Sequence, residues 1–352
     1  MTARRGASHR VRALRRRTRV ALAVLMCGGL VVATGAPAAA DPAGPTHYRS
    51  TITAVEGDGA DAVSLEVLGG DAFIVLRVRP GTTVEVPGYD GEPYVRIGAD
   101  GVVEVNERSP ARWLNDARYG AADLEIPAAA DADAPPLWSV AGRDGVYAWH
   151  EHRIHWMSPA LPSHVDPDLS AVQPVMDWEL PLVIDGEPVT VHGELVWVPG
   201  PGPAFPLTVV AVAALLVVGS TLRWPVLAPV AALVASLASL AVAVPANTGL
   251  PTGAEGEPAL VVLPLLTLAV TGAGLHRWRH ADTGSGPGLV AAAGVPLLVW
   301  GIAQAGALTR PLVPGPVAVG AVRFVVALAL AAGLAVVLVG LRTLLTQRTD
   351  AV

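Results

Sequence analysis

The stretch from Leu195 to Leu222, LVWVPGPGPAFPLTVVAVAALLVVGSTL, divides the chain into two parts of opposite chemical character. Residues 41–203 are charged, aromatic and rich in turn residues, whereas the residues that follow are mostly Ala, Val and Leu with almost no charge. A single globular core does not combine both characters, and long uncharged apolar runs are typical of membrane proteins. The alternating Pro and Gly of residues 199–203 predict a stiff, unstructured linker between two domains.

Five apolar segments follow the linker, each close to the ~20 residues that a helix needs to span hydrocarbon. We expect about five transmembrane helices in a domain at 204–345, followed by a tail at 346–352. The helix cores contain no Asp, Glu, His or Arg, and their most polar group is Gln304. Transporters usually place ionisable residues in the membrane, so we expect a compact helical anchor and keep membrane transport as an alternative. The expected bounds of the helices are 204–222, 225–244, 258–275, 288–308 and 324–341.

The charged residues between these segments predict how the chain lies in the plasma membrane. The loop at 245–257 contains two Glu and no Arg. By the positive-inside rule, this loop and the N-terminal domain face away from the cytoplasm, and the C-terminus faces the cytoplasm. Arg310 and Arg323 oppose the rule, but they lie at segment ends where their side chains can reach the headgroups. The basic residues expected on the cytoplasmic side are Arg223, Arg277, Arg279, Arg342 and Arg348.

Residues 1–40 have the three parts of a bacterial signal peptide. An arginine-rich start precedes the apolar run Val20–Thr34, and Ala38-Ala39-Ala40 supplies small residues for cleavage before Asp41. An uncleaved anchor helix is the alternative. The only cysteine, Cys27, lies inside the apolar run, so the mature chain can form no disulfide and no cysteine-ligated metal site.

Residues 41–198 show the alternating apolar and polar pattern of β-strands, interrupted by turn residues. We expect a mainly-β domain outside the cytoplasm, either a sandwich or a small barrel. Asp185-Gly186 is the clearest hairpin signal, with Gly69-Gly70 and Asp100-Gly101 as two others. One short helix is expected at 110–114, with Ser109 as its N-terminal cap. The expected strands are 47–55, 62–68, 72–79, 82–86, 93–97, 102–106, 137–140, 146–149, 178–184 and 189–198.

The region 41–203 is strongly acidic, with 15 Asp and 11 Glu against 9 Arg. This excess of carboxylates repels nucleic acid and attracts cations, so DNA or RNA is not expected as a partner. All 24 basic residues of the chain are arginine. With so much Ala, Val, Gly and Pro, this indicates the codon usage of a GC-rich genome such as that of an actinobacterium.

Three of the six histidines of the N-terminal domain cluster in the segment YAWHEHRIHWM, residues 147–157. On a strand, His150 and His152 would lie on one face, whereas a turn at residues 151–153 would bring His155 back towards His150. Imidazole is the commonest metal ligand, and copper and zinc are its usual partners. The cluster therefore predicts a copper or zinc site.

Further ligands for such a site are available elsewhere in the domain. Met157 would add a soft ligand suited to Cu(I), and His192 is a second weaker candidate. His47 and His164 are additional possible ligands.

A purely structural role for these histidines is the alternative, since Trp149, Arg153 and Trp156 alternate with them and favour a hydrogen-bonded aromatic belt. The spacing H-x-H-x-x-H differs from the H-E-x-x-H of zinc hydrolases. The sequence has no G-x-S-x-G nucleophile motif and no Gly-rich phosphate loop. We therefore expect no catalytic residues and a protein that is not an enzyme.

Four runs of the sequence carry a resemblance to a known group of proteins: YVRIG at 94–98, SPARWLNDARYG at 109–120, WHEHRIHWM at 149–157 and WVPGP at 197–201. Together they resemble a family of uncharacterised actinobacterial membrane proteins. The resemblance implies a signal peptide, an outer β domain and several C-terminal helices, and it implies no activity. The layout is also loosely similar to that of bacterial envelope proteins that handle copper.

These patterns predict a non-enzymatic protein of the bacterial cell envelope whose acidic outer domain binds a copper or zinc ion or a partner protein. A structural or assembly module that binds another membrane protein, with purely architectural histidines, is the first alternative. A membrane transporter is the second.

Overall fold

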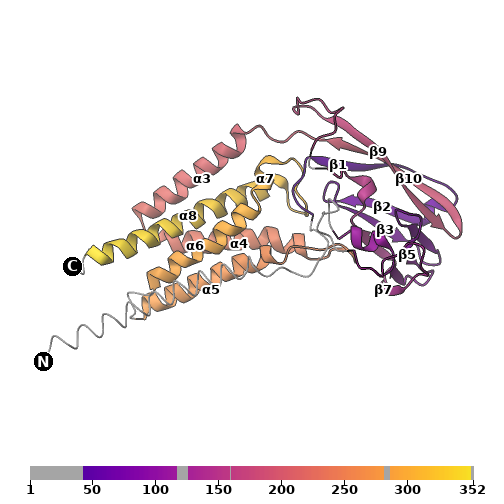
Figure 1. Ribbon diagram of the computed structural model, residues 1–352. Coiled ribbons are helices and arrows are strands. Elements are labelled where there is room, and N and C mark those ends of the chain that lie inside the picture. Colours follow the sequence, from indigo (N-terminus) through magenta and orange to yellow (C-terminus); the bar gives the residue numbers. More distant parts are fainter. Residues whose placement is uncertain (1–42, 117–125, 159, 281–285, 350–352) are drawn as a thin grey trace.

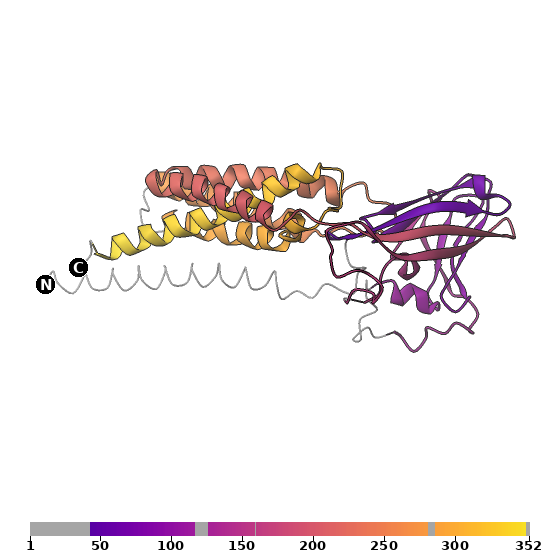
Figure 2. The same cartoon turned by 90° about the horizontal axis from the view of Figure 1, so that it is seen from above.

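A computed structural model of the chain describes residues 43–116, 126–158, 160–280 and 286–349, and the expected signal peptide lies outside these ranges. The described chain forms two bodies placed end to end (Figure 1), which are also distinct when seen from above (Figure 2). One body is a β domain that ends near Trp197, and the other is a set of helices that begins at Ala204. The expected fold class, a mainly-β domain followed by apolar helices, is confirmed.

The β domain contains a strand at each of the ten expected places. The strands are β1 (Tyr48–Glu56), β2 (Val63–Leu68), β3 (Phe73–Val78), β4 (Val84–Pro87), β5 (Pro93–Ile97), β6 (Val103–Asn106), β7 (Trp138–Gly142), β8 (Val146–Trp149), β9 (Gln173–Ile184) and β10 (Glu187–Trp197). They form a seven-stranded sheet of order β1-β10-β9-β4-β5-β6-β7 and a three-stranded sheet of order β2-β3-β8. Of the two expected architectures, two open sheets around a common core correspond to the sandwich.

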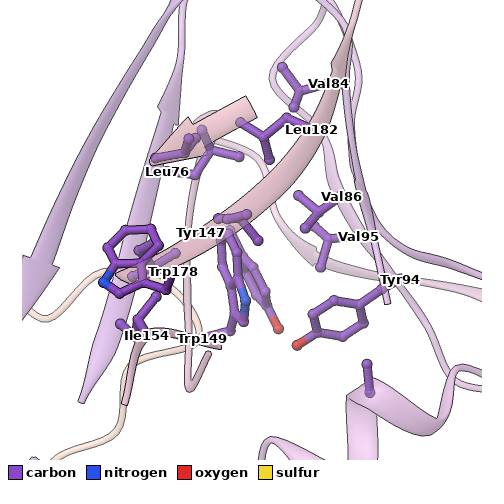
Figure 3. Packing of buried hydrophobic residues seen from close by; sticks show 14 of the residues in the cluster. Leu76, Val84, Val86, Tyr94, Val95, Tyr147, Trp149, Ile154, Trp178 and Leu182 are labelled. Atoms are coloured by element: carbon purple, nitrogen blue, oxygen red, sulfur yellow. The ribbon is translucent and has the colours of Figure 1, made fainter. Parts of the chain in front are cut away.

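Both sheets contribute side chains to one hydrophobic core (Figure 3). On β9, Trp178, Leu180 and Leu182 are buried, whereas the residues between them are exposed, as the two-residue period of a strand requires. Leu76 of β3 and Trp149 of β8 fill the same core from the other sheet. Each such side chain stabilises the fold by about 1.5–3 kcal/mol, so the domain has a core that needs no disulfide.

The hairpin between β9 and β10 turns at Asp185 and Gly186, whose φ angles are +50° and +88°. Positive φ at both positions is the signature of a type I′ turn, whose twist matches that of the strands. Asp185 is held in this conformation by Thr83, whose backbone N–H donates to Asp185 Oδ1 at 2.8 Å. The turn sets a register in which Trp178 lies opposite Gly193.

The short helix α2 (Pro110–Leu114) is present, but Ser109 does not cap it through its side chain. The Ser109 hydroxyl instead donates to the buried Glu92 carboxylate at 2.5 Å. Glu92 Oε1 also accepts the backbone N–H of Ala111 at 3.5 Å. Ser109 therefore occupies the N-cap position, as predicted, but its side chain makes no capping hydrogen bond, because a buried carboxylate from a neighbouring turn provides the acceptor for this end of the helix.

Among the described residues, four helices are long and apolar enough to cross a membrane: α3 (Ala204–Arg223), α4 (Leu227–Asn247), α5 (Ala259–Arg279) and α8 (Val319–Thr349). The remaining expected span, 288–308, is divided into α6 (Gly286–Ala303) and the single turn α7 (Gly306–Thr309). Its apolar part, Gly288–Ala303, is shorter than the other four. Gln304, expected within a helix core, lies between α6 and α7, where regular helical hydrogen bonding is interrupted.

Small residues allow the helices to pack closely. Ala235 and Ser239 of α4 are fully buried, as their four-residue spacing predicts, and Ala231 is half-buried. Between α6 and α8, Gly294 and Gly333 approach so closely that a Cβ on Gly294 would lie 2.6 Å from the Gly333 carbonyl oxygen.

Successive helices alternate in direction relative to the β domain (Figure 1). The helices α3, α5 and α8 run away from the β domain, whereas α4 and α6 return towards it. Arg223, Arg279 and Arg342 consequently lie at the far end of the bundle, where Arg342 Nη1 donates to the Leu222 carbonyl at 3.2 Å. Glu255 lies on the loop between α4 and α5, at the end next to the β domain.

Loops at the near end of the bundle are hydrogen-bonded to the β domain. The Ala148 N–H of β8 donates to the Thr252 carbonyl of the α4–α5 loop at 2.7 Å. Thr46 and Leu312 exchange two backbone hydrogen bonds of 3.0 and 3.2 Å. The two bodies are therefore joined by backbone contacts as well as by the linker.

Candidate functional site

The histidine-rich segment begins where β8 ends. β8 pairs with β3 up to the register Ile74↔Trp149, after which the chain enters the 3-10 helix η2 (His152–Ile154). The Glu151 side chain caps this helix by accepting the Arg153 backbone N–H at 3.1 Å. Of the two conformations expected for the segment, the turn is confirmed and the continuous strand is wrong.

Glu151 is the centre of a buried polar network. Its side chain is 0% exposed and accepts hydrogen bonds from Arg153 Nε at 2.7 Å and from Trp149 Nε1 at 2.8 Å. Arg153 also donates to the Pro87 carbonyl at 3.2 Å and lies over the Tyr89 ring, 4.9 Å from its centroid. A buried carboxylate costs several kcal/mol unless it is paired and hydrogen-bonded. This network meets that condition and fixes the turn.

The same network shifts the pKa of two of its members. Burial acts to lower the pKa of Arg153, but the charge of Glu151 and their hydrogen bonds outweigh burial and raise it. Burial, reinforced by the charge of Glu151, raises the pKa of Tyr89 well above its ordinary value. Arg153 therefore stays charged and Tyr89 stays neutral.

The Tyr89 hydroxyl accepts the His152 backbone N–H at 3.0 Å and donates to Asn115 Oδ1 at 2.5 Å.

The three clustered histidines occupy two different environments. His150 is 1% exposed and packs against Phe73, with ring centroids 4.3 Å apart. His155 is also 1% exposed, whereas His152 is half-buried. The ring centroid of His155 lies 5.9 Å from that of His150 and 5.3 Å from that of His152. The turn thus brings all three imidazoles together, with His155 in contact with the other two.

An open pocket of about 470 Å³ lies between this segment and β9. The pocket forms where η2 packs against β9. β4 pairs with Val183 and Ile184, further along β9. Both His152 and His155 line the pocket, and the buried His150 is not one of its lining residues. The side chains of the pocket that bear on its chemistry are His152, His155, Met157, Met176, Asp177 and Glu179.

The two methionines of the pocket come from different elements. Met157, predicted as a weaker ligand, follows η2 and is 36% exposed. Met176 lies on β9 and is partly buried against the core. The sequence patterns did not identify Met176 as a candidate ligand. The signal for it was the scarcity of methionine: the chain has four, and Met1 and Met26 precede residue 40, which leaves Met157 and Met176.

The other histidines of the β domain have different neighbours. His192, the second weaker candidate, lies on β10, with its ring nitrogens 3.3 Å from Glu179 and 3.8 Å from Glu56. It therefore touches a residue of the pocket without lining it. His164 Nε2 donates to the Val175 carbonyl at 2.8 Å, a contact that holds the loop to β9.

His47 lies where β1 meets the linker. Its ring stacks on Trp197 with centroids 4.2 Å apart, and His47 Nδ1 donates to the Val198 carbonyl at 3.0 Å. Burial lowers the pKa of His47 below its ordinary value, so its imidazole is mostly neutral at pH 7. The placement makes His47 part of the connection to the linker.

The residues of the pocket fit a metal ion in one respect and not in another. Two imidazoles bound to one ion through bonds of about 2 Å have ring centres roughly 5–6 Å apart, and the His152–His155 separation of 5.3 Å falls in this range. Within the described ranges, no three side chains of His, Cys, Asp or Glu are arranged to hold a metal ion. The pocket therefore offers two nitrogen ligands, and a complete site needs ligands of another kind.

Comparison with protein-family models, curated proteins and solved structures finds no match to this chain. Its function is therefore inferred from the geometry of the pocket and from the distribution of charge.

Proposed function

We propose that the chain is a non-enzymatic, multi-pass protein of the bacterial plasma membrane whose β domain binds a metal ion, copper or zinc, outside the cytoplasm. The observation that carries the proposal is that His152 and His155 line the same pocket with their ring centroids 5.3 Å apart. His150 packs beside His155 and against Phe73, and so supports the site from within the core. The carboxylates of Asp177 and Glu179 at the same pocket attract cations towards it.

The orientation in this proposal is supported by the distribution of charge along the bundle. Arg223, Arg279 and Arg342 lie at the end of the bundle remote from the β domain, and Glu255 lies at the near end. The positive-inside rule assigns the arginine-rich end to the cytoplasm. The β domain and the metal pocket then face the exterior.

Metal retention by the full-length protein tests the proposal. The protein is purified without a tag into lipid nanodiscs, stripped of metal, incubated with Cu(I), Cu(II) or Zn(II) and desalted, and the bound metal is measured by elemental analysis. We expect near-stoichiometric retention of at least one of these ions and loss of retention in the variant His152→Ala/His155→Ala.

The matched control is the pair His276 and His280 at the end of α5, whose ring centroids are 4.6 Å apart. The variant His276→Ala/His280→Ala should retain the ion as the wild-type protein does. Equal retention by both double variants, or no retention by the wild-type protein, would refute the proposal.

A second function, an assembly module that binds another membrane protein, is favoured by the backbone contacts between the two bodies. The bonds Ala148–Thr252 and Thr46–Leu312 fix the β domain on the helix loops, which suits a domain that presents a partner at a set height above the membrane. Isolation of the protein from membranes in mild detergent should then yield a stoichiometric partner. Recovery of the chain alone after mild crosslinking would count against this function.

A further inference from the structure

We infer that the pocket is selective for a soft monovalent cation, Cu(I) or its analogue Ag(I), bound by the thioether sulfurs of Met157 and Met176 together with His152 and His155. This inference rests on the proposed metal-binding function and specifies the ion. Met176 lies far from the histidine cluster in the sequence. It lines the pocket because η2 packs against β9.

The distribution of methionine in the chain is the first argument. Met1 and Met26 belong to the first 40 residues, so Met157 and Met176 are the only methionines in the remainder of the chain. Both line this pocket, together with two of the six histidines of the β domain. Methionine commonly fills gaps in cores, and Met176 packs partly against the core, but Met157 is 36% exposed and does not fill a gap in the core.

The chemistry of the available ligands is the second argument. Zn(II) and Cu(II) sites are usually completed by nitrogen, oxygen or thiolate ligands. In the part of the chain that the structure describes, no group of three His, Cys, Asp or Glu side chains is suitably arranged. Thioether sulfur is a ligand that selects Cu(I). Two imidazoles and two thioethers supply four uncharged ligands for an ion of single charge.

The charged side chains around the pocket are compatible with a bound ion of single positive charge. Arg153 lines the pocket as well, but its guanidinium is held by the buried Glu151 carboxylate through bonds of 2.7 and 3.0 Å. The arginine charge is thereby compensated and does not oppose a cation. Asp177 and Glu179 contribute negative charge at the same pocket, and Glu179 also approaches His192 at 3.3 Å.

Competitive titration of the full-length protein in nanodiscs tests the inference. The background variant Cys27→Ser removes the only thiol. Cu(I) is supplied under anaerobic conditions in competition with a chromophoric Cu(I) chelator, and Zn(II) in competition with a chromophoric Zn(II) chelator. Met157→Leu/Met176→Leu, which keeps the apolar volume, should weaken Cu(I) binding about tenfold or more, or by at least ~1.4 kcal/mol. Any Zn(II) affinity should stay unchanged.

X-ray absorption at the copper edge supplies an independent measurement. The wild-type protein loaded with Cu(I) should show copper–sulfur scattering, and the double leucine variant should show nitrogen or oxygen scattering alone. An unchanged melting temperature of the apo variant confirms that its fold is intact.

The outcomes separate this inference from the proposed function. Binding that is lost in His152→Ala/His155→Ala but unchanged in Met157→Leu/Met176→Leu, without sulfur scattering, would leave a metal-binding protein and overturn the assignment of a soft-cation site. No binding of Cu(I), Cu(II) or Zn(II) by the wild-type protein would overturn the proposed function and the inference together.

Discussion

At the scale of single residues, two pairs of Glu and Arg show how burial changes the importance of the same ionic contact. Glu151 and Arg153 are 2.7 Å apart, with side chains 0% and 22% exposed. Glu66 and Arg77 are also 2.7 Å apart, but their side chains are 48% and 44% exposed. Water and salt screen the exposed pair, whereas the buried pair sits within the turn that carries the histidines.

Substitution of Glu151 should therefore be far more damaging than substitution of Glu66. Glu151→Ala leaves Arg153 without its buried partner, and we expect a loss of about 3–5 kcal/mol of stability. Glu66→Ala should cost roughly 0–1 kcal/mol. Urea unfolding of the protein in nanodiscs, followed by tryptophan fluorescence, measures both. Similar unfolding midpoints for the two variants would show that the Glu151 network does not hold the turn.

At the scale of secondary-structure elements, β8 is held on both sides by different parts of the chain. It pairs with β3 within its sheet, and Ala148 donates to Thr252 of the α4–α5 loop. Gly253, next to Thr252, has a φ of +90°, and a Cβ there would collide with the Ala148 carbonyl oxygen. The loop can approach β8 only because residue 253 has no side chain. β8 thus contacts the α4–α5 loop through Ala148 and leads directly into the segment that lines the pocket.

Gly253→Ala should release the α4–α5 loop from β8. Gly249→Ala is the matched control, because Gly249 lies on the same loop with a φ of +72°, and a Cβ added to it would meet open space. Both variants bear the backbone cost of positive φ, about 1 kcal/mol, and only Gly253→Ala adds the collision. Hydrogen exchange measured by mass spectrometry should show faster exchange around Ala148 in Gly253→Ala alone. Equal protection in the two variants would contradict the proposed role of this contact.

At the scale of the whole molecule, charge is separated along the long axis. The β domain is rich in carboxylates. At the opposite end of the bundle, Arg223 and Arg279 end α3 and α5, and Arg342 of α8 donates to the Leu222 carbonyl. The spanning-length helices α3, α4, α5 and α8 lie between these two ends. Such a distribution favours one orientation in the membrane, because arginine-rich loops remain in the cytoplasm.

Cysteine labelling in intact cells should reveal this orientation. In the Cys27→Ser background, Glu187→Cys places a thiol beside the β9–β10 turn, and Arg279→Cys places one at the end of α5. A membrane-impermeant maleimide should label the first variant in intact cells and the second only after permeabilisation. The reverse pattern would place the β domain in the cytoplasm and refute an external metal site.

The amino-acid sequence by itself determined the elements of this protein. The two-residue period predicted a strand at each of the ten observed places. Of the five apolar runs predicted to span a membrane, four form helices of spanning length in the described part of the chain. These features are local, since strand and helix periods and turn residues act over a few neighbouring positions. A distant group changed one local prediction: the carboxylate of Glu92, and not the Ser109 side chain, accepts a backbone N–H at the start of α2. The predicted apolar span at 288–308 is interrupted near Gln304.

Only the tertiary structure decided which side chains meet in the candidate site. The sequence identified His150, His152 and His155 as a cluster, because they are neighbours in the chain, but not that His150 is buried against Phe73. Met176 joins Met157 in the pocket because η2 packs against β9. His192 meets Glu179 through the register of β9 and β10. Such contacts depend on how strands pair across long separations, which is a property of the packed core and leaves no fixed spacing in the sequence.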